Sequence, residues 1–210
     1  MDENRRPIKT RSAGWARRFT DVLVKRDISP NQISVVSMLF ALFGTVTLNI
    51  DNGVAGSICC IIGIQLRLLC NLFDGMVAVE GGKQSAIGSL YNEFPDRVAD
   101  SLLIVGLGFA IGQSDLGWFA ALAAALTAYV RVFGGSLGLP QSFMGPMAKQ
   151  HRMAVMTVAL VLNMFEASYY STHYALLIAL VIIAIGSVAT CGTRTLAIAR
   201  QLKGNAHVDQ

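Results

Sequence analysis

The sequence predicts an all-α integral membrane protein: a bundle of six transmembrane helices preceded by an amphipathic helix at the membrane interface. Of its 210 residues, 53% are hydrophobic and 14% are charged, and the mean hydropathy is +0.52. A water-soluble domain normally has about a quarter charged residues. Long apolar runs also recur at the length that a helix needs to cross a bilayer. These observations favour a single membrane domain over a water-soluble one.

The segment before the first apolar run, residues 1–30, is basic and amphipathic. Eight of the 17 Lys and Arg residues of the chain lie in it. In WARRFTDVLVKRDI, apolar residues recur at helical spacing with basic residues between them; they are Trp15, Phe19, Val22 and Leu23. Such a helix can lie on a membrane and attract anionic lipid head groups. We therefore expect membrane lipids as its partner and no nucleic acid, with a solvated basic tail as the alternative.

Six apolar segments follow within residues 31–200, the expected transmembrane domain, and residues 201–210 form a short cytoplasmic tail. Ser29 can cap the first helix, and Pro30 suits a first helical turn. Polar turns, two of them rich in Gly or Pro, separate the later segments. The predicted spans are 31–49, 54–79, 85–112, 117–138, 151–167 and 173–199.

Charge sorts the turns between these spans into two sets. The turns DNG, GQSDLG and EASYYSTH contain acidic residues but no Lys or Arg. The other turns and the adjoining helix ends contain nearly all the remaining basic residues. Because basic loops stay in the cytoplasm, both termini are expected there, in a protein of the bacterial inner membrane.

A polar cluster interrupts the apolar pattern where the second and third spans meet at the cytoplasmic side. Within each helix its members recur at steps of three or four residues, which places them on one face; they are Asn71, Asp74, Asn92, Asp96 and Asp100. Oxygen donors from two helices suit Mg²⁺ or Mn²⁺ and not Zn²⁺, because no Cys or His takes part. The sequence therefore predicts a site for one or two divalent ions that is open to the cytosol.

The same stretch resembles the signature of the CDP-alcohol phosphotransferase (CDP-alcohol phosphatidyltransferase) family. That signature is D-x2-D-G-x2-A-R-x8-G-x3-D-x3-D, and residues 71–96 keep its spacing throughout. Five of the eight specified positions match: Asp74, Gly75, Ala78, Gly88 and Asp96. The departures are Asn71 and Asn92 at the first and third acidic positions and Val79 at the arginine position.

The resemblance implies a homodimeric enzyme of phospholipid biosynthesis that depends on a divalent metal. Its donor would be CDP-diacylglycerol or another CDP-alcohol, its acceptor a polar molecule with a hydroxyl group, and CMP would leave. By the same resemblance, Asp96 would take the proton of the acceptor. Donor-binding residues would be Asp74, Gly75, Ala78 and Gly88. Metal ligands would be Asn71, Asp74, Asn92 and Asp96, with Asp100 one turn further along.

Three basic residues near the cytoplasmic ends of the fourth and fifth spans are candidates to bind a phosphate of the acceptor or donor; they are Arg131, Lys149 and Arg152. Anchoring at the membrane surface is the alternative for each. The asparagines also leave open an inactive relative that binds lipid or nucleotide or acts as a scaffold. A small transporter or channel is disfavoured, because the acids gather at one face and form no path across the bilayer.

Overall fold

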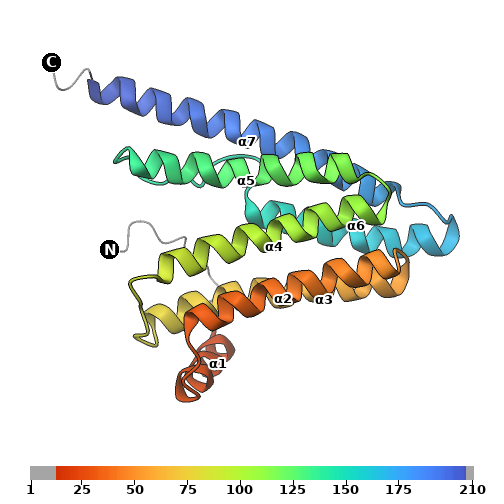
Figure 1. The fold of residues 1–210 in the computed structure, drawn as a ribbon, viewed down its shortest axis with the longest axis horizontal. Helices are drawn as coiled ribbons and strands as arrows, with labels where there is room; N and C mark the ends of the chain where they lie inside the picture. The colour runs from red at the N-terminus through yellow and green to blue at the C-terminus, as the bar shows by residue number, and fades with distance from the viewer. Residues whose placement is uncertain (1–12, 207–210) are drawn as a thin grey trace.

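The structure is a computed structural model that describes residues 13–206, and within this range it contains seven α-helices and no strand. The all-α prediction is therefore confirmed. The helices are α1 (Gly14–Lys25), α2 (Pro30–Ile50), α3 (Val54–Val79), α4 (Gly88–Ala110), α5 (Ser114–Ser136), α6 (Lys149–Tyr169) and α7 (Tyr174–Ala206). Figure 1 shows α2–α7 running alongside one another, with the short α1 at the end of the bundle where α7 also ends.

The six predicted spans correspond to α2–α7, with most boundaries within three residues of those expected. Four of these helices, α2, α3, α5 and α7, are long and apolar enough to cross a membrane, which fits an integral membrane protein. The other two, α4 and α6, are as long but carry charged residues towards their N-terminal ends: Glu93, Asp96, Arg97 and Asp100 in α4, and Lys149 and Arg152 in α6. These residues belong to the polar cluster described below.

The start of α2 forms as its sequence predicts. Ser29 Oγ accepts a hydrogen bond from the backbone N–H of Gln32 at 3.2 Å, and Gln32 Oε1 accepts one from the backbone N–H of Ser29 at 2.9 Å. This reciprocal pair satisfies two N–H groups that the helix itself cannot, while Pro30 has no N–H to satisfy. The result fixes the end of α2 that faces the polar cluster.

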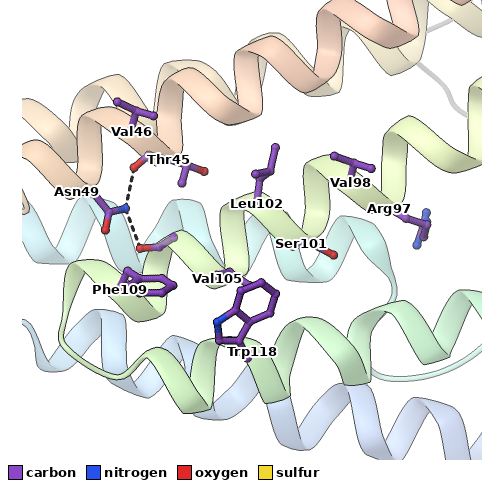
Figure 2. A pocket seen from close by; sticks show the side chains of 11 residues that line it. Thr45, Val46, Asn49, Arg97, Val98, Ser101, Leu102, Val105, Phe109 and Trp118 are labelled. Atoms are coloured by element: carbon purple, nitrogen blue, oxygen red, sulfur yellow. Dashed lines mark hydrogen bonds between the residues drawn. The ribbon is translucent and has the colours of Figure 1, made fainter.

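Glycines allow α2 and α3 to pack with their backbones in close approach. A Cβ atom on Gly63 would lie 2.6 Å from the carbonyl oxygen of Phe40 and 3.1 Å from Gly44 Cα. Small residues at such a crossing let two helices approach more closely than larger side chains permit. On its other side α2 is tied to α4, because Asn49 Nδ2 donates to the carbonyl oxygen of Gly106 at 3.0 Å (Figure 2).

Helix α1 packs against the end of α3. The Phe19 and Phe73 ring centroids are 4.5 Å apart, and the Trp15 ring meets Phe73 edge-on at 6.1 Å. Beyond the helix, Lys83 Nζ donates to Asp27 Oδ1 at 2.6 Å, and this hydrogen bond and the lysine charge lower the pKa of Asp27. A helix is present from Gly14 to Lys25, and its place at the membrane interface stays a prediction. The basic residues before position 13 lie outside the described residues.

Acidic residues in the turns without Lys or Arg cap the N-termini of helices. Asp51 accepts hydrogen bonds from the backbone N–H groups of Gly53 at 2.9 Å and Gly56 at 3.0 Å, and these bonds lower its pKa. Glu166 similarly accepts from the backbone N–H groups of Tyr174 and Ala175, each at 2.9 Å. A carboxylate is stabilised at a helix N-terminus by the free N–H groups and the helix dipole. The acidic residues of these turns therefore stabilise the starts of α3 and α7.

Candidate active site

The polar cluster is built by α3 and α4, which run in opposite directions, and by the start of α6. In α3, Asp74 is buried, and its Oδ2 accepts a hydrogen bond from Ser34 Oγ of α2 at 2.9 Å. Among residues 13–206, no basic side chain lies within ion-pair distance of Asp74. The charge of Asp96 repels that of Asp74. Asp74 is thus a buried carboxylate without a cationic partner in direct contact.

Asp96 of α4, in contrast, is surrounded by basic side chains. Its carboxylate is in contact with Lys149 Nζ at the start of α6, and Arg67 Nη2 of α3 lies 3.4 Å from Asp96 Oδ1. The Arg97 guanidinium lies 3.8 Å from the other oxygen. The side chain of Asp96 remains 13% exposed, so it can be reached from outside the bundle.

One turn deeper, Asp100 is held between two buried arginines. Arg67 Nη2 lies 2.6 Å from Asp100 Oδ1, and Arg152 Nη2 lies 2.9 Å from Oδ2. The three side chains are 0–4% exposed. Buried charges require such partners because their loss of hydration is unfavourable. Both oxygens of Asp100 are therefore already engaged by guanidinium groups.

Two further arginines complete the basic side of the cluster. Arg131 of α5 pairs with Glu93 of α4, and its guanidinium lies over the Phe143 ring at 5.1 Å. Arg194 of α7 donates to the carbonyl oxygens of Met144 at 2.8 Å and Thr127 at 2.6 Å. Arg194 is close enough to Arg131 and Arg152 for their charges to repel.

Positive charge exceeds negative charge in this cluster. Six cations, with Arg97 among them, face four carboxylates, which leaves a net charge of +2. The cations are Arg67, Arg97, Arg131, Lys149, Arg152 and Arg194, and the carboxylates belong to Asp74, Glu93, Asp96 and Asp100. An excess of this kind attracts anionic ligands.

The structure brings most of the predicted site residues together. Asp74, Asp96 and Asp100 converge, and the three basic candidates each pair with an acid of α4. Asn71 is half-buried, and its Nδ2 is buried without a hydrogen-bond partner in the described part of the chain. Asn92 is exposed. Gly75, Ala78 and Gly88 are half-buried along the same two helices, and Val79 is exposed.

Five residues of this cluster were not predicted as site residues from the sequence: Ser34, Arg67, Glu93, Arg97 and Arg194. A signal existed for Arg67, because a charged residue within the apolar run IGIQLRLLC is unfavourable in a membrane unless it has a partner. Ser34 gave no signal, since a serine in an apolar helix often bonds only to its own backbone.

The donor set fits a divalent cation at Asp74 better than elsewhere. Carboxylate and amide oxygens of Asp74, Asp96 and Asn71 are the ligand types that Mg²⁺ and Mn²⁺ take. Asp74 has no cationic partner in direct contact among the described residues, whereas Asp100 has three: Arg67, Arg97 and Arg152. Within residues 13–206, no group of three or more His, Cys, Asp or Glu side chains is arranged to hold a metal. The site is therefore poorer in carboxylates than a four-aspartate motif would be.

Comparison with known proteins identifies the family. The family model described as CDP-alcohol phosphatidyltransferase matches residues 27–201. The chain belongs to the CDP-alcohol phosphatidyltransferase family. As a member it is a metal-dependent transferase of phospholipid synthesis, which moves a phosphatidyl group from a CDP-activated alcohol.

Two curated relatives of this phosphatidyltransferase are named as synthases of phosphatidylinositol phosphate and archaetidylinositol phosphate. A phosphatidylinositol phosphate synthase of Streptomyces avermitilis is 25% identical over 191 residues, which cover 87% of this chain and 77% of the relative. An archaetidylinositol phosphate synthase of Pyrococcus horikoshii is 21% identical over 154 residues, which cover 73% of this chain and 80% of the relative.

Solved structures share the fold. Phosphatidylinositol phosphate synthase of Mycobacterium tuberculosis with CDP-DAG bound has a TM-score of 0.71 at 17% identity, covering 89% of this chain and 94% of that one. The same enzyme in complex with manganese and citrate has a TM-score of 0.70 at 17% identity, with coverages of 87% and 88%. At this identity the likeness concerns the fold of the phosphatidyltransferase.

Two apolar hollows lie away from the acidic residues of the cluster. One, of about 550 Å³, is bounded by α2, α4 and α5, with Arg97 near one end and Phe109 and Trp118 near the other (Figure 2). The second, of about 1010 Å³, lies between α6 and α7 near Glu166. Their linings are almost wholly apolar, so neither provides the polar groups that phosphate transfer requires.

Proposed function

We propose that the chain transfers the phosphatidyl group of CDP-diacylglycerol to a hydroxyl group of a phosphorylated polyol such as inositol phosphate, with release of CMP. The observation that carries this proposal is the net charge of +2 in the polar cluster. The names of the two curated relatives support an inositol phosphate as acceptor. A phosphomonoester brings close to two negative charges and three strong acceptor oxygens, which guanidinium groups bind well.

The roles of the side chains follow from their surroundings. The hydroxyl oxygen of the acceptor attacks the phosphorus next to diacylglycerol, its proton passes to Asp96, and the bond from that phosphorus to CMP breaks. Asp74, positioned by Ser34, would hold the divalent ion together with Asp96 and the amide oxygen of Asn71. When bound, that ion supplies positive charge to the diphosphate of the donor.

Lys149 links acceptor binding to the base. In the structure its ammonium group contacts Asp96. A phosphate that binds next to Lys149 and Arg131 would give the ammonium a second anionic partner. Binding of the acceptor would then release the Asp96 carboxylate from Lys149, so that it can take the proton of the hydroxyl group.

Release of CMP tests this function directly. Purified protein in lipid nanodiscs receives CDP-diacylglycerol, Mn²⁺ or Mg²⁺, and one of four acceptors: inositol, inositol 1-phosphate, glycerol or glycerol 3-phosphate. Charge-assisted hydrogen bonds contribute about 1.5–3 kcal/mol each, so one such bond predicts about a 10- to 150-fold preference for a phosphorylated acceptor in kcat/KM. Equal or better use of the unphosphorylated pair would contradict the proposal. If no acceptor supports release of CMP, the result would favour an inactive relative that binds lipid or nucleotide or acts as a scaffold.

We further propose that all six helices α2–α7 cross the bilayer, that both termini are cytoplasmic and that α1 lies at the inner surface of a bacterial inner membrane. The distribution of Lys and Arg supports this topology. Inside the bundle, Lys149 and Arg152 of α6 pair with Asp96 and Asp100 of α4. Charged groups within membrane proteins take such positions.

Cysteine labelling tests the topology. In a chain whose four native cysteines are replaced by serine, Ser114→Cys and Ser168→Cys should react with a membrane-impermeant maleimide added outside spheroplasts. The control Ser85→Cys, in the turn between α3 and α4, should react only after lysis. The reverse pattern would place the polar cluster on the outer side of the membrane and refute the topology.

A further inference from the structure

Arg67 is a buried cation of the cluster that contacts both Asp96 and Asp100. It lies on α3, four residues before Asn71, and is fully buried. A single nitrogen, Nη2, makes its polar contacts: 2.6 Å to Asp100 Oδ1, 3.4 Å to Asp96 Oδ1 and 3.3 Å to the carbonyl oxygen of Asp96. Arg67 therefore bridges the last acid of the family motif and the acid one turn beyond it.

The other two nitrogens of the Arg67 guanidinium are not satisfied by the described residues of the protein. Both Nε and Nη1 are buried without a hydrogen-bond partner in the described part of the chain. Buried unpaired donors are destabilising. A bound anion or a second carboxylate would satisfy them, and Asn71, whose Nδ2 also lacks a partner, stands one helical turn away. The guanidinium is thus kept at this position despite incomplete pairing.

Charge limits how many divalent ions the cluster can hold. Its net charge without an ion is +2, because six cations face four carboxylates. On the proposed function, the donor diphosphate and a phosphomonoester acceptor together bring about four negative charges. One divalent ion then makes the loaded site neutral, whereas a second would leave it with a net charge of +2. Like charges so close together in a site of low dielectric are unfavourable.

We propose that Arg67 takes the place of one divalent ion, so that each chain binds a single Mg²⁺ or Mn²⁺, held near Asp74. The two asparagines complement the arginine, since each lacks the charge of an aspartate. This inference deepens the proposed function, and its substrate charges rest on it. Arg67 is then a positioning residue: it holds Asp96 and Asp100 in the orientation that a second ion would otherwise impose.

The number of Mn²⁺ ions bound per chain tests this inference without any turnover. Electron paramagnetic resonance of free Mn²⁺ is titrated against protein in nanodiscs that contain CDP-diacylglycerol, with no acceptor present so that no turnover occurs. We expect one ion for the wild type and one for Asn71→Asp/Asn92→Asp, because Arg67 still neutralises the acids. Adding Arg67→Gln to that double variant should raise the count to two. The matched control, Arg67→Lys in the same double variant, keeps the charge and should remain at one.

Several results would overturn the inference. Two ions in the wild type or in the double variant would show that Arg67 displaces no ion. One ion in the Arg67→Gln triple variant, with circular dichroism and thermal midpoint matching the Arg67→Lys control, would do the same. If the triple variant does not fold, the counts in the wild type and double variant decide alone. Absence of CMP release with a count of one would instead contradict only the proposed function.

Discussion

Asp96→Asn should lower the rate of CMP release by about 10²- to 10⁴-fold, the range expected for the loss of a general base. The amide cannot take the proton of the acceptor hydroxyl, and it also weakens one ligand of the divalent ion. Asp96 is the acid of the motif that remains partly exposed, so substrate can reach it. The effect should appear in kcat at saturating donor and acceptor, measured in nanodiscs at matched protein concentration.

Folding should survive this change, because Arg67 keeps its closer contact with Asp100. The control is Asp115→Asn, an exposed acid in the first turn of α5. It should leave both the rate and the thermal midpoint unchanged. A rate for Asp96→Asn within twofold of the wild type would remove Asp96 from the chemistry and leave the motif as a guide to the fold alone.

Asp100→Asn should have the largest effect on stability. The substitution leaves two buried guanidinium groups, those of Arg67 and Arg152, without the carboxylate that both contact. Removing one partner of a buried ion pair typically costs about 3–5 kcal/mol. We expect a clearly lower thermal midpoint in detergent micelles, at every pH at which the arginines stay charged.

The comparison variant for Asp100 is Asp27→Asn. Asp27 also forms an ion pair, with Lys83, but its side chain is 98% exposed. Exposed pairs contribute little, so the thermal midpoint should not change measurably. Equal effects of the two substitutions, or no effect of either, would mean that the Asp100 triad does not hold α3, α4 and α6 together.

The positions of the helices could be predicted from the sequence because they depend on local signals. Ser29 and Pro30 marked the start of α2, and both perform the expected roles. The apolar runs predicted six helices, and the structure has a helix in each place. The hydropathy criterion alone finds four candidate spans, since the charged residues of α4 and α6 reduce their apolar character. Those charges pair with one another across the bundle, which no local pattern reveals.

The site could be predicted only in part for the same reason. The spacing of Asp74 and Asp96 follows a helical period, so their convergence could be inferred from sequence. The contacts of Lys149 with Asp96 and of Ser34 with Asp74 join residues 53 and 40 positions apart, and they depend on how four helices pack. Asn92 has the correct spacing but is exposed, which shows that period alone does not determine burial.

The buried guanidinium of Arg67 also has a consequence for how this sequence can change over generations. Codons for asparagine and aspartate differ by a single base, so a return to aspartate at position 71 or 92 is mutationally easy. While Arg67 lies beside Asp96 and Asp100, however, the added carboxylate gains no second metal ion to bind. Selection would then favour the return only after the arginine is lost. The three positions should therefore be inherited as a unit, with arginine beside asparagine in one lineage and an apolar residue beside aspartate in another.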